Sequence, residues 1–205
     1  MGIGTSDTGR EAVRRLIARA DVVVESFAVG VAARLHIDYA SARAIKPDII
    51  HCSITGFGQD GPWAASPGHD LVVQAGTGVL GVAPNGTNPA FQAADYAGAS
   101  FGAIGILGAL YRRRATGEGA QLDIAMFDSL FAMADIALTG ALARSNGQPG
   151  TPMMEVWGGN PRYAIYPTAD ERFVAVSLLE PRLWARFCAA IGRADLVFAD
   201  ERPAD

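Results

Sequence analysis

Two periods of hydrophobic and polar positions alternate along the first 55 residues. Residues 9–19 carry apolar side chains at helical spacing, and Thr8 and Glu11 before them have the spacing of a capping box. Residues 21–25 hold a short β-branched run, typical of strands buried on both faces of a parallel sheet, and residues 48–54, after Pro47, are predicted to form a second buried strand. This strand, helix, strand order predicts an α/β fold.

The same criteria predict further elements along the chain. Residues 56–62, rich in glycine and proline, follow the second strand at the edge where ligands bind in open parallel sheets. Residues 70–79 are apolar and fit more than one type of element, and a composition shift predicts a domain boundary near Gly150. The other predicted elements are helices over 30–35, 39–45 (capped by Asp38), 97–114, 127–144 and 181–191, and strands over 121–125 and 172–178.

The composition excludes several classes of function. Half of the 205 residues are apolar, enough for a sizeable core, and the net charge of -4 leaves no basic stripe for nucleic acid. Cys52 and Cys188 lie in apolar runs without metal-ligand or disulfide spacing, so we expect no metal site and a reducing, cytoplasmic setting.

A long apolar stretch covers residues 97–111, about 15 residues, which is shorter than the ~20 needed to cross a bilayer. Its glycines at 98, 102, 105 and 108 favour a closely packed buried helix. Residues 1–10 lack the pattern of a signal peptide. We therefore expect neither membrane insertion nor export.

One phosphate-binding pattern is present but out of context. Residues 76–81 match GxGxxG, which in dinucleotide-binding folds must open a helix. Here Pro84 and Gly86 break the chain directly afterwards. We expect no nicotinamide cofactor at this segment.

Asp95 is the most informative acidic residue, because it lies in an apolar setting just before the long helix. It is either a plain N-cap or a working group, since unpaired N–H groups at a helix start can hold an oxyanion beside a carboxylate. His69, in a glycine-preceded turn, is either a solvated loop residue or its partner. His36 and His51 have no motif around them.

Several segments, in order along nearly the whole chain, resemble the class III coenzyme A transferases, a family that also includes formyl-CoA transferase and α-methylacyl-CoA racemase. These segments are 20–27, 30–35, 53–62, 67–70, 94–95 and 117–119. The resemblance implies a Rossmann-like large domain over residues 1–150, and a linker with the start of a smaller α+β domain over 151–205. It also implies a homodimer, and a family length that extends beyond both Met1 and Asp205, so we expect this chain to be part of a longer enzyme.

The resemblance also implies the site. It places the nucleophile on Asp95, which in the transferases forms a mixed anhydride and then an aspartyl-CoA thioester. In the racemases the equivalent aspartate exchanges an α-proton with a histidine at the His69 position. Coenzyme A is then a substrate and not a resident cofactor, and its contacts are expected at Ser26, Phe27, Ala28, Arg34, Pro67, Gly68, His69 and Asp70.

Three functions stay open at this point. CoA transfer between an acyl-CoA and a carboxylic acid comes first, because residues 71–75 look like the transferase version of that segment. His69 is the main argument for a racemase. The third is a truncated fragment without turnover.

Overall fold

The computed structural model describes residues 6–82, 91–134, 145–146 and 160–198. The chain divides into two compact units, Met1–Ala134 and Asp135–Asp205. The boundary predicted near Gly150 lies outside the described residues.

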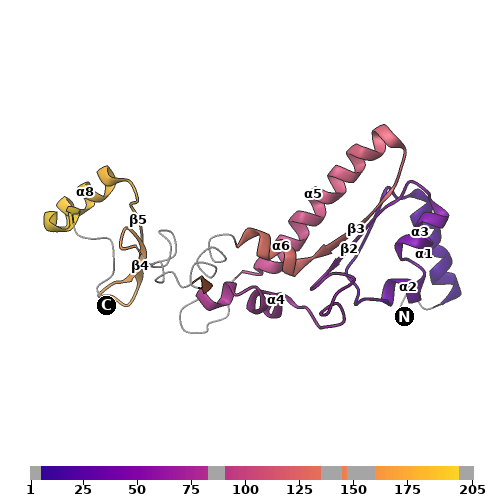
Figure 1. The fold of residues 1–205 in the computed structure, drawn as a ribbon, viewed down its shortest axis with the longest axis horizontal. Helices are drawn as coiled ribbons and strands as arrows, with labels where there is room; N and C mark the ends of the chain where they lie inside the picture. The colour runs from indigo at the N-terminus through magenta and orange to yellow at the C-terminus, as the bar shows by residue number, and fades with distance from the viewer. Residues whose placement is uncertain (1–5, 83–90, 135–144, 147–159, 199–205) are drawn as a thin grey trace. The chain divides into compact units, whose positions relative to one another are not determined.

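A three-stranded parallel sheet forms the centre of the first unit (Figure 1). Its strands are β1 (Val22–Glu25), β2 (Ile50–Thr55) and β3 (Ala120–Ala125), in the order β1-β2-β3. The central strand is buried as predicted, with Ile50 and Cys52 inaccessible to solvent, whereas β1 is not buried on both faces, because Val24 is 55% exposed. The predicted α/β fold is confirmed.

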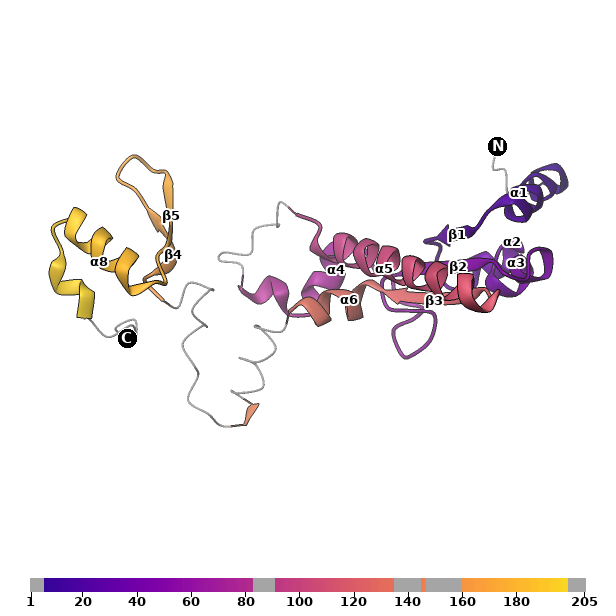
Figure 2. The same ribbon diagram turned by 90° about the horizontal axis from the view of Figure 1, so that it is seen from above.

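Three helices lie toward the end of the sheet where the strands begin (Figure 2). They are α1 (Asp7–Arg19), α2 (Val31–Leu35) and α3 (Tyr39–Ile45). Asp38 caps α3 as predicted, since its carboxylate accepts from Ala40 N at 3.2 Å. The predicted cap of α1 is wrong by two residues, because the hydroxyl of Ser6 accepts from Gly9 N and Thr8 lies inside the helix.

Helix α5 (Ala93–Thr116) begins four residues before its predicted start, so Asp95 lies inside it. At 24 residues it is long and apolar enough to cross a membrane by length and composition alone. The argument from a stretch of about 15 apolar residues therefore does not hold. In this structure α5 packs along β2 and β3, as helices do when they cover a parallel sheet.

Small residues allow α5 to approach the sheet closely. A Cβ on Gly98 would lie 2.8 Å from Met126, and one on Gly102 would lie 3.1 Å from Ile54 of β2. Gly108 differs, because a Cβ there would meet nothing within 4 Å. The close packing predicted from the glycines is confirmed for the first part of the helix and not for Gly108.

Helix α4 (Asp70–Gly76) and the 3-10 helix η1 (Val79–Val82) resolve the ambiguous segment, and α6 (Met126–Met133) follows β3. The GxGxxG pattern thus starts at the end of a helix, without the strand that precedes a dinucleotide-binding loop. The predicted helix over residues 127–144 lies outside the described residues from 135 onward. Helices α4, α5 and α6 share a core made of Val73, Ala94, Ala97, Met126 and Leu130.

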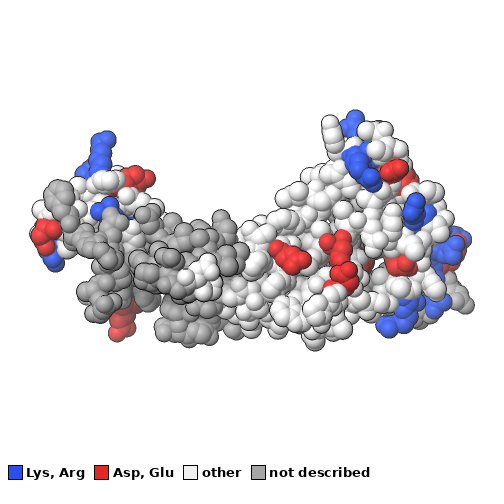
Figure 3. Space-filling model, in the orientation of Figure 1, with Lys and Arg blue, Asp and Glu red and all other residues white. Residues whose placement is uncertain are grey.

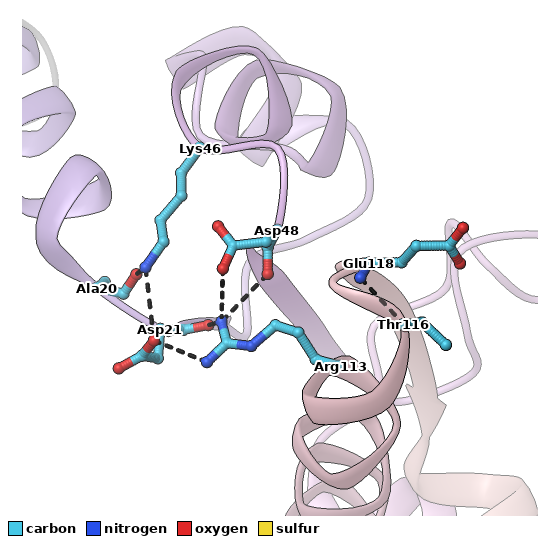
Figure 4. Close-up of polar contacts among 7 residues, drawn as sticks. All are labelled: Ala20, Asp21, Lys46, Asp48, Arg113, Thr116 and Glu118. Atoms are coloured by element: carbon cyan, nitrogen blue, oxygen red, sulfur yellow. Dashed lines mark hydrogen bonds and ion pairs between the residues drawn. The ribbon is translucent and has the colours of Figure 1, made fainter.

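Arg113 fastens the last turns of α5 to the beginnings of β1 and β2 (Figure 4). Its guanidinium donates to the carbonyl oxygens of Asp21 and Asp48 at 3.4 and 3.1 Å, and to Asp21 Oδ1 at 2.7 Å. Lys46 Nζ donates to Ala20 O at 2.6 Å beside them. The Arg113 hydrogen bond, assisted by Lys46, lowers the pKa of Asp21.

The second unit is a β-hairpin followed by a helix, an α+β arrangement. Strands β4 (Tyr163–Pro167) and β5 (Phe173–Ser177) pair antiparallel, and α8 (Pro181–Ala190) precedes the 3-10 helix η3 (Ala194–Phe198). Trp184 is buried, and its indole N–H donates to Leu196 O at 3.1 Å. β5 and α8 agree with the sequence, whereas β4 was not predicted.

Candidate active site

The turn that carries His69 lies directly on the carboxyl end of β2. Gly56 follows that strand, and a Cβ on Gly56 or on Gly68 would lie 2.5 Å from the other residue's Cα. Only glycine on both sides permits this approach. The contact holds Pro67 and His69 at the edge where parallel strands end, which is where ligands bind in open α/β sheets.

Aromatic side chains fix the loop between β2 and this turn. The Trp63 ring lies 5.6 Å from the Phe57 ring and 5.5 Å from the Phe127 ring, both edge to face. Phe127, at the start of α6, also donates its N–H to Gly56 O at 3.0 Å. The loop is therefore packed against the same helix that follows β3.

Asp95 lies at the same edge, because α5 leads back into β3 through a turn at Gly117 and so runs antiparallel to the strands. It is the third residue of α5, and its side chain is exposed. The N-cap residue is Gln92, whose side chain makes no capping bond. Asp70 of α4 caps the helix instead, as its Oδ1 accepts from Ala94 N at 2.8 Å and from Asp95 N at 3.3 Å. The alternative in which Asp95 is a plain N-cap is wrong.

The first N–H groups of α5 are all engaged. Asp70 takes those of Ala94 and Asp95, and the other two go to backbone oxygens. These are Ala93 N to Phe91 O at 3.0 Å and Tyr96 N to Gln92 O at 3.1 Å. The expectation that unpaired N–H groups of this helix start hold an oxyanion is therefore wrong.

The surroundings of Asp95 disfavour its charged form. Partial desolvation, although the side chain is exposed, is the largest cause that raises the pKa of Asp95, and the charge of Asp70 adds to it. His69 acts in the opposite direction and lowers that pKa. The structure thus brings His69, Asp70 and Asp95 into one electrostatic cluster.

Gln74 belongs to this cluster and was missed from the sequence. Its side chain is 2% exposed, and its Nε2 donates to Asp70 Oδ2 at 2.6 Å and to Phe91 O at 3.2 Å. The signal was the spacing of Asp70 and Gln74, four residues apart, which makes neighbours only on a helix. Since residues 70–79 were ambiguous, that spacing carried no weight.

The segment Ser26–Ala28 follows β1 and is fixed by a buried acid. Glu25 is 7% exposed, and its Oε2 accepts from Phe27 N at 2.8 Å. Ser26, Phe27 and Ala28 are themselves exposed. They lie at the carboxyl end of β1, beside that of β2, because Glu25 and Ser53 are register partners.

Arg34 lies on α2, the first helix after this segment, and its side chain is exposed. Within the described residues, no hydrogen bond or ion pair joins Ser26–Ala28 or Arg34 to Asp95. The expected coenzyme A contacts thus form two groups, one after β1 and one around Gly68 after β2.

Across the described ranges, no group of three His, Cys, Asp or Glu side chains could hold a metal ion. Cys52 and Cys188 are buried and are not paired in a disulfide. Burial raises the pKa of the Cys52 thiol, which makes it a poor nucleophile.

Comparison with known proteins identifies the family. Residues 5–205 match the description CoA-transferase family III. The acetyl-CoA:oxalate CoA-transferase of Acetobacter aceti is 36% identical, with 95% of this chain and 51% of the relative covered. The succinate–glutarate CoA-transferase of Agrobacterium fabrum is 32% identical over 88% and 45%, and the human alpha-methylacyl-CoA racemase is 33% identical over 90% and 49%. The chain spans about half the length of these curated relatives.

Solved structures agree. A CAIB/BAIF family protein from Brucella suis matches with a TM-score of 0.76 and 29% identity, over 95% of this chain and 52% of that protein. Sequence and fold together show that this chain belongs to CoA-transferase family III.

Proposed function

We propose that this protein moves coenzyme A between an acyl-CoA thioester and a carboxylic acid, with Asp95 as the nucleophile. The observation that carries the proposal is the state of that carboxylate. It is exposed at the carboxyl edge of the sheet, it does not cap its helix, and its surroundings raise its pKa. A more basic carboxylate is a stronger nucleophile once it is ionised. Two relatives that are named as CoA-transferases support the same reaction.

The proposed reaction proceeds in balanced steps. A carboxylate oxygen of Asp95 attacks the thioester carbonyl, the C–S bond breaks, and coenzyme A leaves as a thiolate from a mixed anhydride. The thiolate then attacks the Asp95 carbonyl and releases the donor acid, which leaves an aspartyl-CoA thioester. The carboxylate of the acceptor acid then attacks the aspartyl-CoA thioester and releases the thiolate from a second mixed anhydride. The thiolate attacks the acceptor's carbonyl, which forms the new acyl-CoA and regenerates the Asp95 carboxylate.

We propose that two groups of residues bind coenzyme A. The exposed Ser26–Ala28 segment and Arg34 supply the first, after β1. Pro67, Gly68 and His69 supply the second, in the turn held against Gly56. Coenzyme A is a substrate of this site and not a resident cofactor.

A racemase is the second candidate, and one observation favours it. His69 acts electrostatically on Asp95 and lowers its pKa, so the structure brings a histidine into the surroundings of this carboxylate. An acid and a base of this kind are what α-proton exchange requires. The similarity to the human alpha-methylacyl-CoA racemase supports this alternative. The two candidates differ in whether Asp95 becomes covalently modified.

Trapping of the covalent intermediate decides between them. The chain is incubated with an acyl-CoA and treated with borohydride or hydroxylamine, and its peptides are analysed by mass spectrometry. We expect an adduct on Asp95 that is lost in Asp95→Asn. Asp128→Asn is the matched control, because Asp128 is likewise the exposed third residue of a helix that starts at this end of the sheet.

Each outcome is decisive. An adduct on Asp95 supports CoA transfer. Exchange of the α-proton with solvent deuterium, without an adduct and lost in His69→Ala, overturns it in favour of the racemase. If neither an adduct nor α-proton exchange is detected, the chain has no turnover, and this result contradicts both candidates.

We further propose that the enzyme works as a homodimer, as the family resemblance implies, and in the cytoplasm, as the spacing of its two cysteines indicates. Light scattering coupled to size-exclusion chromatography measures the mass of the particle. A mass equal to one chain contradicts the dimer.

A further inference from the structure

Two residues of α4 hold the first turn of α5 in place. Asp70 and Gln74 lie one helical turn apart, and Gln74 Nε2 donates to Asp70 Oδ2 at 2.6 Å. The other oxygen of Asp70 accepts from the N–H groups of Ala94 and Asp95. A chain of hydrogen bonds therefore runs from inside α4 to the backbone of the proposed nucleophile.

Gln74 is the fixed end of this chain. It is 2% exposed, and its amide also donates to Phe91 O at 3.2 Å, in the segment that enters α5. Both of its partners are acceptors, so the orientation of its amide group is determined. Beside it, Val73 is inaccessible to solvent and packs in the core shared by α4 and α5. Gln74 therefore has little freedom to move.

We propose that Asp70 and Gln74 are positioning residues for Asp95: Gln74 orients the Asp70 carboxylate, and that carboxylate holds the first turn of α5, and with it Asp95, in place. The inference rests on the proposed function, in which Asp95 is the reacting group. It also reassigns Asp70, which the family resemblance places among the coenzyme A contacts. Both of its oxygens are used inside the protein, so Asp70 acts through Asp95 and not on the ligand.

Two physical effects make this arrangement useful for a nucleophile. A carboxylate that accepts from two N–H groups closes the helix start and holds its backbone in one place. The same negative charge lies close to Asp95 and raises its pKa. One side chain thus holds the backbone of the nucleophile in place and adds to the effect of desolvation on its pKa.

Two variants separate the effect on the position of Asp95 from the effect on its pKa. Neither measurement requires an active enzyme. Gln74→Met keeps the length of the side chain and the charge of Asp70. It removes the two hydrogen bonds that Gln74 donates to Asp70 and to Phe91 O. We expect hydrogen exchange at the amides of Ala94 and Asp95 to accelerate at least tenfold. Gln92→Met is the matched control, because Gln92 is exposed at the N-cap without a capping bond and its loss should leave both rates unchanged.

Asp70→Asn removes the charge. We expect the midpoint of the Asp95 carboxyl titration, followed by its carbon-13 chemical shift, to fall relative to the unaltered chain. A role in folding alone would not move this midpoint.

The outcomes stay distinct from those of the trapping experiment. Unchanged exchange at Ala94 and Asp95 in Gln74→Met, or an unmoved Asp95 titration in Asp70→Asn, overturns the inference even where an adduct forms. If Gln74→Met does not fold, the Asp95 titration in Asp70→Asn decides alone. If both expected changes occur in a chain that forms no adduct, the changes support the positioning role. The missing adduct then contradicts only the proposed reaction.

Discussion

At the scale of the residue, Asp95 combines two properties that rarely occur together. A carboxylate in the first turn of a helix is usually stabilised in its charged form by the helix dipole. Here desolvation and the neighbouring Asp70 outweigh that effect, and the pKa of Asp95 is raised. The charged state needed for attack is therefore maintained at some cost to the stability of the fold.

We expect Asp95→Asn to raise the free energy of unfolding at pH 7. A raised folded-state pKa stabilises the fold at pH values below the unfolded pKa, and this contribution is lost as the pH rises through the folded pKa. Near pH 3 the aspartate is protonated and resembles asparagine, so the difference should vanish there. The gain at pH 7 should stay below about 1 kcal/mol, because solvent screens an exposed carboxylate.

Thermal unfolding at both pH values measures the difference. Asp128→Asn is the control, since loss of an acid near the start of α6 should lower stability or leave it unchanged. An Asp95→Asn variant that is less stable than the unaltered chain at pH 7 contradicts the expectation.

At the scale of the element, the sequence predicts what depends on local pattern. The strands β1 and β2 and the Asp38 cap of α3 are all recognised from neighbouring residues. The Asp70 cap of α5 could not be predicted, because donor and acceptor lie 24 residues apart and meet only when α4 packs on α5. Asp95 was recognisable as a candidate, whereas the residue that controls it was not.

The contact between Gly56 and Gly68 is another long-range feature, and it can be tested. Gly56→Ala would place a Cβ 2.5 Å from the Gly68 backbone, which cannot yield as a flexible side chain does. We expect a loss of about 1–3 kcal/mol in the free energy of unfolding, the usual cost of overpacking. Displacement of the His69 turn should weaken acyl-CoA binding as well.

Gly108→Ala is the matched control for this substitution. A Cβ at Gly108 meets nothing within 4 Å, and alanine is favoured over glycine inside a helix by roughly 1 kcal/mol. We expect this variant to be as stable as the unaltered chain or more so in urea unfolding. Equal stability of Gly56→Ala and Gly108→Ala would show that the turn does not rest on β2 as described.

At the scale of the whole molecule, the cationic residues are separated along the chain from the residues of the candidate active site. No Lys or Arg occurs between Pro47 and Tyr111, the range that contains His69, Asp70 and Asp95. Figure 3 shows the cations of the first unit gathered over α1–α3 and the end of α5. Cations that contact the phosphates of coenzyme A in the proposed reaction therefore come from outside that range, and the helices after β1 carry some of them.

Arg34 is the cation that we expect to contact those phosphates. Because charge-assisted hydrogen bonds contribute about 1.5–3 kcal/mol, Arg34→Ala should weaken binding of coenzyme A by roughly 10- to 150-fold. Pantetheine, which has the same thiol arm without phosphates, should bind the variant and the unaltered chain equally. Isothermal titration calorimetry with both ligands measures the difference, and Arg186→Ala on α8 of the second unit is the control. An equal loss for the two ligands would mean that Arg34 supports the fold around β1, and the phosphates would then have to be held elsewhere.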